Sequence, residues 1–187
     1  MANFVTRIPD GDNRARSVCA ECGHIDYENP KIVVGAVVAH DGRVLLCRRA
    51  IEPRLGFWTL PAGYLELGET VQDGAIREAR EEAEADIALD GILAVYSISR
   101  IGQVQVIFRA RFADLAAPRF AAGVESAEVG LFAWEDIPWS DLAFPTVCWS
   151  LRAWRVNMHS PLGAPAGNPP EDLRGMRRPD AGEGSVR

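Results

Sequence analysis

Residues 63–87, GYLELGETVQDGAIREAREEAEADI, hold far more carboxylates than cations, because Arg77 and Arg80 are the only basic side chains in this stretch. Like charges three or four positions apart on a helix repel one another, at a cost of about 0.2–0.5 kcal/mol per pair. Glu78, Glu81 and Glu82 have this spacing and share one helical face. The face is therefore either a solvated acidic surface or a site for a cation.

The same stretch predicts where the helix begins and which side of it is buried. Thr70 is followed three residues later by Asp73, a pattern typical of a helix N-terminus. The apolar stripe that we expect to face a sheet consists of Ala75, Ile76, Ala79 and Ala83.

Apolar runs on both sides of the helix predict a mixed β-sheet. KIVVGAVVAH (31–40) is rich in β-branched residues, as in a strand buried on both faces, and a DG turn leads into RVLLCRR (43–49). Further strands are expected within 56–63, 91–100, 103–113 and 128–137, and a second helix at 144–157. The order strands, helix, strands, helix indicates an α/β fold with helices packed on the sheet.

Composition narrows the function classes. The chain has 187 residues, 48% of them apolar, which suits one domain with a substantial core. Its formal charge of −6 gives no electrostatic footprint for nucleic acid or for an anionic membrane. No apolar signal region is found, and no apolar run approaches the roughly 18 residues of a membrane span. The four cysteines indicate reduced thiols, so the cytoplasm is the expected compartment.

The acidic face suits a small divalent cation. Glutamate oxygens are hard ligands, and magnesium takes a few carboxylates while collecting its other ligands from water and substrate phosphates. Gly63 precedes the helix closely enough for its turn to border the same site. Arg77 is expected to orient a carboxylate through a forked hydrogen bond rather than to meet the substrate.

The spacing of these residues resembles the box of the Nudix hydrolases, G-x5-E-x7-R-E-U-x-E-E-x-G-U. The matching positions are Gly63, Glu69, Arg77, Glu78, Glu81 and Glu82. Glu84 departs from the pattern, because the box has a glycine there that ends the helix in a left-handed turn. The departure concerns the exit of the helix and not its metal-binding face.

The resemblance implies a Nudix-type α/β/α sandwich that hydrolyses a nucleoside diphosphate linked to another moiety with the help of Mg²⁺, or alternatively Mn²⁺. The implied metal ligands are Glu78, Glu81 and Glu82. A backbone carbonyl of Ala62 or Gly63 is expected to join them, and Glu69 and Arg77 correspond to positions that brace the site. Such an enzyme needs no covalent nucleophile, because bound metal neutralises phosphate charge and activates a water.

A wider resemblance covers most of residues 19–152 and points to the zinc-ribbon-bearing Nudix group, which includes FAD pyrophosphatases and ADP-ribose or NADH pyrophosphatases. The proline- and tryptophan-rich motif of many NADH pyrophosphatases is absent after the box, so FAD and ADP-ribose rank ahead of NADH. Two other functions stay open: a non-catalytic nucleotide-binding module, and housecleaning hydrolysis of NADH or nucleoside triphosphates. The sequence also leaves the oligomeric state open, a homodimer included.

Three segments are expected along the chain. Residues 1–29 resemble a degenerate zinc ribbon, in which Cys19 and Cys22 form one knuckle, while the stretch before them lacks a second pair of cysteines. His24 is available as a third ligand, but structural zinc needs four, so we expect no bound zinc. Residues 30–158 form the Nudix domain. Residues 159–187, rich in proline and glycine, are predicted to be a disordered tail.

Outside the box, several residues are candidates for catalysis or substrate binding. Glu128, and less strongly Glu125, follow a strand where Nudix enzymes often carry a further glutamate that acts as a base or metal ligand. Arg48 and Arg49 are expected to meet phosphate or a nucleotide edge, with a surface role as the alternative. Tyr96 is expected to stack on a flavin or adenine ring, with a core position as the alternative.

Overall fold

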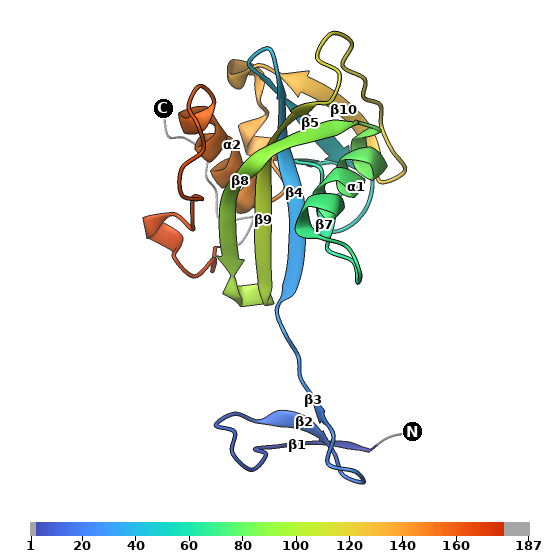
Figure 1. Cartoon of the computed structure of the whole chain (residues 1–187), viewed down its shortest axis with the longest axis vertical. Helices are drawn as coiled ribbons and strands as arrows, with labels where there is room; N and C mark the ends of the chain where they lie inside the picture. Colours follow the sequence, from blue (N-terminus) through green and yellow to red (C-terminus); the bar gives the residue numbers. More distant parts are fainter. Residues whose placement is uncertain (1–2, 178–187) are drawn as a thin grey trace. The chain divides into compact units, whose positions relative to one another are not determined.

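The computed structural model describes residues 3–177, which belong to two compact units divided between Pro30 and Lys31 (Figure 1). The first unit is a three-stranded antiparallel sheet in the order β1-β2-β3, made of β1 (Phe4–Arg7), β2 (Arg16–Cys19) and β3 (Ile25–Asp26). Strand β1 is exposed throughout, and the buried apolar side chains of the unit are Val18 and Cys19. This unit therefore has only a minimal core of its own.

The second unit is built on a seven-stranded mixed sheet. Its strands are β4 (Lys31–His40), β5 (Arg43–Arg49), β6 (Trp58–Thr59), β7 (Ala62–Tyr64), β8 (Ile87–Ile98), β9 (Gln103–Phe112) and β10 (Ser126–Phe132). The main order is β10-β5-β4-β9-β8, with β6 paired to β5 and β7 paired to β4. Only the β4–β9 pair is parallel among the named pairs of this sheet. The predicted hairpin forms between β4 and β5, where Asp41 and Gly42 have φ angles of 47° and 74° as a tight turn requires.

Strand β4 is the central strand and is buried on both faces, as its β-branched sequence predicts. Val34, Ala36 and Val38 point into one apolar cluster, and Val37 points into the other. The alternation of side chains along a strand thus supplies both layers of the core.

Two long helices cover the opposite faces of this sheet (Figure 1). Helix α1 (Val71–Ala83) packs its small residues Ala75, Ala79 and Ala83 against β4, and helix α2 (Pro145–Asn157) packs Trp149 and Leu151 in the other cluster. The predicted α/β/α sandwich is therefore confirmed. No helix within residues 3–177 is both long and apolar enough to cross a membrane.

Short 3₁₀ helices occupy the connections: η1 (Ser99–Ile101), η2 (Trp134–Asp136), η3 (Trp139–Asp141) and η4 (Pro170–Asp172). The last of these lies in the segment for which composition predicts disorder. Residues 159–177 instead follow the edge of β8, where Ala166 exchanges backbone hydrogen bonds with Leu93 and Val95. Composition is a poor guide here, because backbone pairing and polar anchors hold the segment without many apolar side chains. The remaining part of the predicted tail, residues 178–187, lies outside the described residues.

The two ends of α1 are formed as the sequence suggests. At the start, Thr70 and Asp73 make a reciprocal capping box, in which the Asp73 N–H donates to Thr70 Oγ1 at 3.1 Å. At the end, Glu84 adopts the left-handed conformation with φ 46° and ψ 30°, and its N–H donates to the Arg80 carbonyl at 3.0 Å. Glu84 therefore makes the turn that the glycine of the box would make, at the cost of a strained backbone.

Replacing Glu84 with glycine should stabilise the protein. The left-handed conformation costs a non-glycine residue roughly 1–2 kcal/mol, and the greater freedom of glycine in the unfolded chain offsets part of the gain. A net increase of about 1 kcal/mol would raise Tm by roughly 2–4 °C in thermal unfolding. Glu84→Gln is the matched control, because it removes the charge and keeps the strain. An equal rise in Tm for both variants would show that charge, and not backbone strain, is relieved.

Candidate active site

A cleft of about 900 Å³ lies in the second unit, between the acidic face of α1 and the first turns of α2. Its floor includes Gln103, Gln105 and Ile107, alternate residues of β9 that share one face of the strand. The acidic residues that line it are Glu52, Glu66, Glu78, Glu81, Glu82 and Glu125. The three box glutamates thus share one cavity, as their helical spacing predicts.

Gly63 leaves room for a glutamate of the helix where β7 runs beside α1. A Cβ atom built on Gly63 would overlap the carboxylate of Glu78. Strand β7 itself is held by β4, with Gly63 opposite Val34. On the helix, a Cβ on Gly74 would come within 2.8 Å of both Glu69 Oε1 and Val34 Cγ2. These two glycines allow the helix, the loop before it and the sheet to approach closely enough to form the site.

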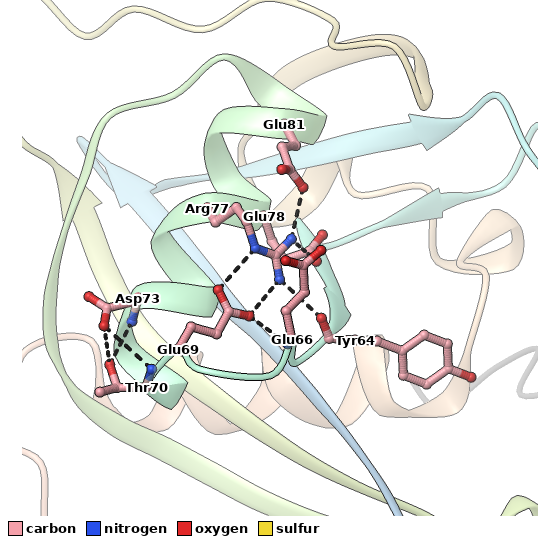
Figure 2. A network of polar contacts seen from close by, with 8 residues as sticks. All are labelled: Tyr64, Glu66, Glu69, Thr70, Asp73, Arg77, Glu78 and Glu81. Carbon is pink, nitrogen blue, oxygen red and sulfur yellow. Dashed lines mark hydrogen bonds and ion pairs between the residues drawn. The ribbon is translucent and has the colours of Figure 1, made fainter.

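The guanidinium of Arg77 lies at the centre of a polar network (Figure 2). It forms a fork with Glu69, in which Nε donates to Oε2 at 3.1 Å and Nη2 donates to Oε1 at 2.8 Å. Nη2 also donates to the carbonyl of Tyr64 at 3.0 Å. The hydrogen bonds from Arg77, and next the one from the Glu66 N–H, lower the pKa of Glu69 to about 2. Glu69 is therefore an anion near neutral pH, and its two hydrogen bonds fix the position of the Arg77 guanidinium.

The third donor of Arg77 connects two of the expected metal ligands. Nη1 donates to Glu78 Oε1 at 2.7 Å and to Glu81 Oε2 at 2.8 Å. Within residues 3–177, no three histidine, cysteine or acidic side chains converge into a ready metal-binding group. Arg77 supplies the positive charge that these two carboxylates share in this arrangement.

Glu82 and Glu78 are nearly inaccessible to solvent, with relative exposures of 5% and 7%. Glu82 Oε2 accepts the backbone N–H of Ala62 at 3.0 Å. Burial raises the pKa of Glu82 to about 8, and burial likewise raises the pKa of Glu78. Two buried carboxylates that resist ionisation fit a divalent cation, which would favour their charged form. Glu78, Glu81 and Glu82 would hold such an ion.

The loop after β9 brings a fourth carboxylate to the site. The N–H groups of Ala121 and Gly123 donate to the carbonyls of Ala83 and Glu82, at 2.9 and 3.1 Å, and so cap the end of α1. A Cβ on Gly123 would overlap the Glu81 carbonyl, so the loop reaches the helix only with glycine at this position. Glu125 then lines the cleft, and its charge contributes to the raised pKa values of Glu78 and Glu82.

The preference for Glu128 over Glu125 is therefore corrected. Glu128 is not among the residues that line the cleft. It lies opposite Arg48 in the β10–β5 pair, with 3.5 Å between Glu128 Oε2 and Arg48 Nη1, and both side chains are about half exposed. A register shift inside β10, between Ser126 and Glu128, lies between the two glutamates in the chain. Such an irregularity cannot be read from the spacing of two glutamates.

The substrate-binding predictions have different outcomes. Arg49 lines the cleft, where its Nε donates to the Pro53 carbonyl at 2.7 Å. Arg48 does not line it and pairs with Glu128 instead. Tyr96 is a core residue, only 1% exposed and packed edge-on against Trp149, and burial raises its pKa to about 12. Tyr96 therefore cannot stack on a substrate ring, because its side chain faces α2 inside the sandwich.

Several residues that line the cleft belong to no motif of the sequence. Tyr64 follows Gly63 directly, is 52% exposed and accepts a hydrogen bond on its hydroxyl from Gln103 Nε2 at 3.0 Å. Gln103 and Gln105 belong to the strictly alternating run of β9, which could have identified the cleft-facing set. Arg100 and Arg177 also line the cleft, and no motif in the sequence points to them.

Comparison with known proteins identifies the family. Residues 29–149 match the family model of the NUDIX domain. The chain belongs to the Nudix family. Residues 2–28 match the model of the Nudix N-terminal zinc ribbon. The placement of the box glutamates along one cleft agrees with this membership.

Individual relatives extend the comparison. A NUDIX hydrolase structure from Nitrosomonas europaea is 43% identical, covers 89% of this chain and 92% of its own, and superposes with a TM-score of 0.80. An ADP-ribose pyrophosphatase of Methanocaldococcus jannaschii is 30% identical over 113 residues, which are 60% of this chain and 67% of the relative. The NAD-capped RNA hydrolase NudC of Vibrio atlanticus is 32% identical over 78 residues, 41% of this chain and 28% of the relative. The chain spans roughly half to two thirds of the length of the first curated relatives it matches.

The ribbon match bears on the expectation that the N-terminal unit holds no zinc. Cys19 and Cys22 form a knuckle in which Gly23 has a φ angle of 77° and its N–H donates to the Cys19 carbonyl at 3.0 Å. The pKa of Cys19 is lowered, first by the backbone N–H of Cys22 and then by that of Glu21. The knuckle thus favours a thiolate, as the family match would suggest, while it supplies only two sulfur ligands.

Zinc analysis of the purified protein checks this expectation. We predict well under one zinc per chain and a Tm almost unchanged in the double variant Cys19→Ser, Cys22→Ser, because two thiolates leave zinc half coordinated. Elemental analysis and thermal unfolding measure both quantities. Stoichiometric zinc that is lost in the double variant would contradict the prediction.

The raised pKa of Glu82 predicts a pH dependence of stability in the metal-free protein. The pKa of Glu82 is about 8 in the folded state, against an ordinary value of 4.5 in the unfolded chain. The protonated carboxyl therefore contributes to the free energy of unfolding in full below about pH 4.5, and this contribution is lost as pH rises through 8. The free energy of unfolding measured with a chelator should therefore fall between pH 5 and 8.5, by on the order of a few kcal/mol.

Two variants isolate this effect. Glu82→Gln should flatten the pH dependence, because glutamine does not titrate. Glu81→Gln, on the exposed part of the same face, should retain it. Identical slopes for the wild type and Glu82→Gln would show that another group controls the dependence.

Proposed function

We propose that this chain is a divalent-metal-dependent pyrophosphohydrolase that cleaves the diphosphate of a nucleoside diphosphate derivative. The observation that carries the proposal is that two buried carboxylates, Glu78 and Glu82, share one cleft with the exposed Glu81 and with Glu125. A buried acidic site of this kind has no role in a purely structural helix. We propose Mg²⁺ as the ion, with Mn²⁺ as the alternative.

The chain's own residues have separable tasks in this reaction. Glu69 and Arg77 hold the helix face against Tyr64, and Gly63 leaves room for the Glu78 carboxylate. Bound metal would neutralise the phosphate charge and lower the pKa of the attacking water. We assign Glu125 as the group that accepts the proton of this water. The water oxygen bonds to phosphorus, one anhydride P–O bond breaks, and two phosphate monoesters leave.

ADP-ribose is the substrate we place first, and FAD the second. ADP-ribose is favoured because a relative that is 30% identical bears the name ADP-ribose pyrophosphatase. A dinucleotide also suits the composition of the cleft, in which Ile98, Ile101 and Trp149 offer apolar surface and Gln103 and Gln105 offer amides. FAD remains the second substrate because its flavin ring can pack against the same apolar surface. The alternative is a Nudix domain that binds nucleotides without turnover, and hydrolysis of any substrate in the panel below would exclude this alternative.

A substrate panel tests the function. FAD, ADP-ribose, NADH, diadenosine polyphosphates and nucleoside triphosphates should be compared for release of nucleoside monophosphate with magnesium. Glu81→Gln and Glu82→Gln should each lower kcat by about 100-fold or more, because each removes the charge of a metal ligand and keeps its size. The control is Glu84→Gln, which lies outside the cleft on the same helix end. Turnover within threefold of wild type in either ligand variant would refute the metal assignment.

A matched pair of loop variants separates Glu125 from Glu128. Glu125→Gln should lower kcat by about 100-fold with little change in KM, as for a group that acts on the proton in the transition state. Glu128→Gln should leave both constants near their wild-type values, because Glu128 pairs with Arg48 outside the cleft. Steady-state kinetics on the best substrate measures this difference, and the reverse result would restore Glu128 as the base.

A further inference from the structure

The C-terminal strap, residues 166–177, forms part of the cleft wall although the NUDIX match ends at residue 149. The strap is held by specific contacts along β8. Asn168 binds both backbone groups of Ser97, because its Oδ1 accepts the Ser97 N–H and its Nδ2 donates to the Ser97 carbonyl, each at 2.8 Å. These bonds reproduce the pairing of a neighbouring strand and fix the position of the strap.

The turn at the end of the strap is equally well defined. Asp172 is 7% exposed, and its carboxylate accepts the N–H groups of Met176 at 2.7 Å and Arg177 at 2.9 Å. Gly175 has a φ angle of 61°, and a Cβ there would overlap the backbone at Ser97 and Ile98. Gly175 and Arg177 both line the cleft. The strap therefore enters the cleft wall through a built turn.

The strap also holds the turn that carries Arg100, which lines the cleft as well. Arg100 lies in η1, between β8 and β9, and the preceding Ser99 donates its backbone N–H to the Arg174 carbonyl at 3.1 Å. The side-chain hydroxyl of Ser99 donates to the same carbonyl. Two arginines from segments far apart in the sequence are thus brought to one wall of the cleft.

The register of the sheet gives the distance of this wall from the carboxylates. Gly63 is level with Val34 and Val106, whereas the turn that holds Arg100 begins beyond Gln103, three residues and about 10 Å further along the strands. Across the sheet, β8 lies three strand spacings, about 14 Å, from the β7 strand that carries Gly63, because β4 and β9 lie between them. Glu66, the acid closest to this level, follows β7 on the far side of β4.

From this placement we propose that Arg100 and Arg177 bind a phosphomonoester carried by the sugar of the substrate, beyond the diphosphate that the carboxylate end holds. The inference rests on the proposed function and deepens it. A diphosphate is too short to reach both ends of the cleft, so the arginines meet the next part of the molecule. Guanidinium groups bind phosphate through paired, charge-assisted hydrogen bonds. The preferred substrates are then nucleoside diphosphate derivatives with one additional phosphate on a ribose.

Equilibrium binding tests this preference without requiring turnover. Dissociation constants should be measured in the presence of magnesium for AMP, adenosine 2′,5′-bisphosphate and adenosine 3′,5′-bisphosphate. One bisphosphate should bind the wild type at least 10-fold more tightly than AMP. Arg100→Gln and Arg177→Gln should each remove most of this difference and leave AMP binding within threefold. Arg174→Gln is the matched control, because Arg174 is an exposed cation of the same strap outside the cleft.

Three results would overturn the inference. These are equal affinity for all three nucleotides, no binding of any of them, or an equal loss of preference in the Arg174→Gln control. Thermal unfolding of each variant confirms that the strap is still folded. Failure of the proposed function has a separate signature, namely no nucleoside monophosphate released from any dinucleotide while the bisphosphate preference persists.

Discussion

The guanidinium of Arg77 is the point on which the site depends, because this one side chain joins three parts of the chain. It holds the loop through Glu69, the short strand β7 through the Tyr64 carbonyl, and the acidic helix face through Glu78 and Glu81. An acidic surface without such a cation would repel itself. With Arg77 in place, Glu69, Glu78 and Glu81 share one positive charge.

The close approach of α1 to the sheet is the second requirement. Ala75, Ala79 and Ala83 face β4 with no exposed surface, and alanine lets a helix lie closer to a sheet than leucine would. This short distance places Glu78 and Glu82 against the strand edge, where solvent is excluded and the N–H of Ala62 reaches Glu82. Small side chains in the core thus determine the electrostatics of the cleft.

Much of this arrangement could be predicted from the sequence, because it follows from local periodicity. The spacing of Glu78, Glu81 and Glu82 implies a shared face, and the alternation in β4 implies a buried central strand. The assignments that failed depend on tertiary contacts. Tyr96 has an aromatic side chain that suits ring stacking, but this side chain faces α2. Glu125 enters the cleft only because Gly123 lets its loop pack on the end of α1. The ordered structure of the strap could not be predicted from apolar periodicity, because Asn168 and Asp172 anchor the strap rather than apolar residues.

The position of the strap also affects how the folded protein behaves toward other copies of itself. Strand β8 is twelve residues long and forms the outer edge of the sheet, where unpaired N–H and carbonyl groups would offer a template for another strand. The backbone of Ala166 and the side chain of Asn168 occupy these groups at Leu93, Val95 and Ser97. The segment that shapes the cleft thereby covers this part of the sheet edge, so truncation of the chain before Ala166 would expose it to pairing with another strand and promote aggregation.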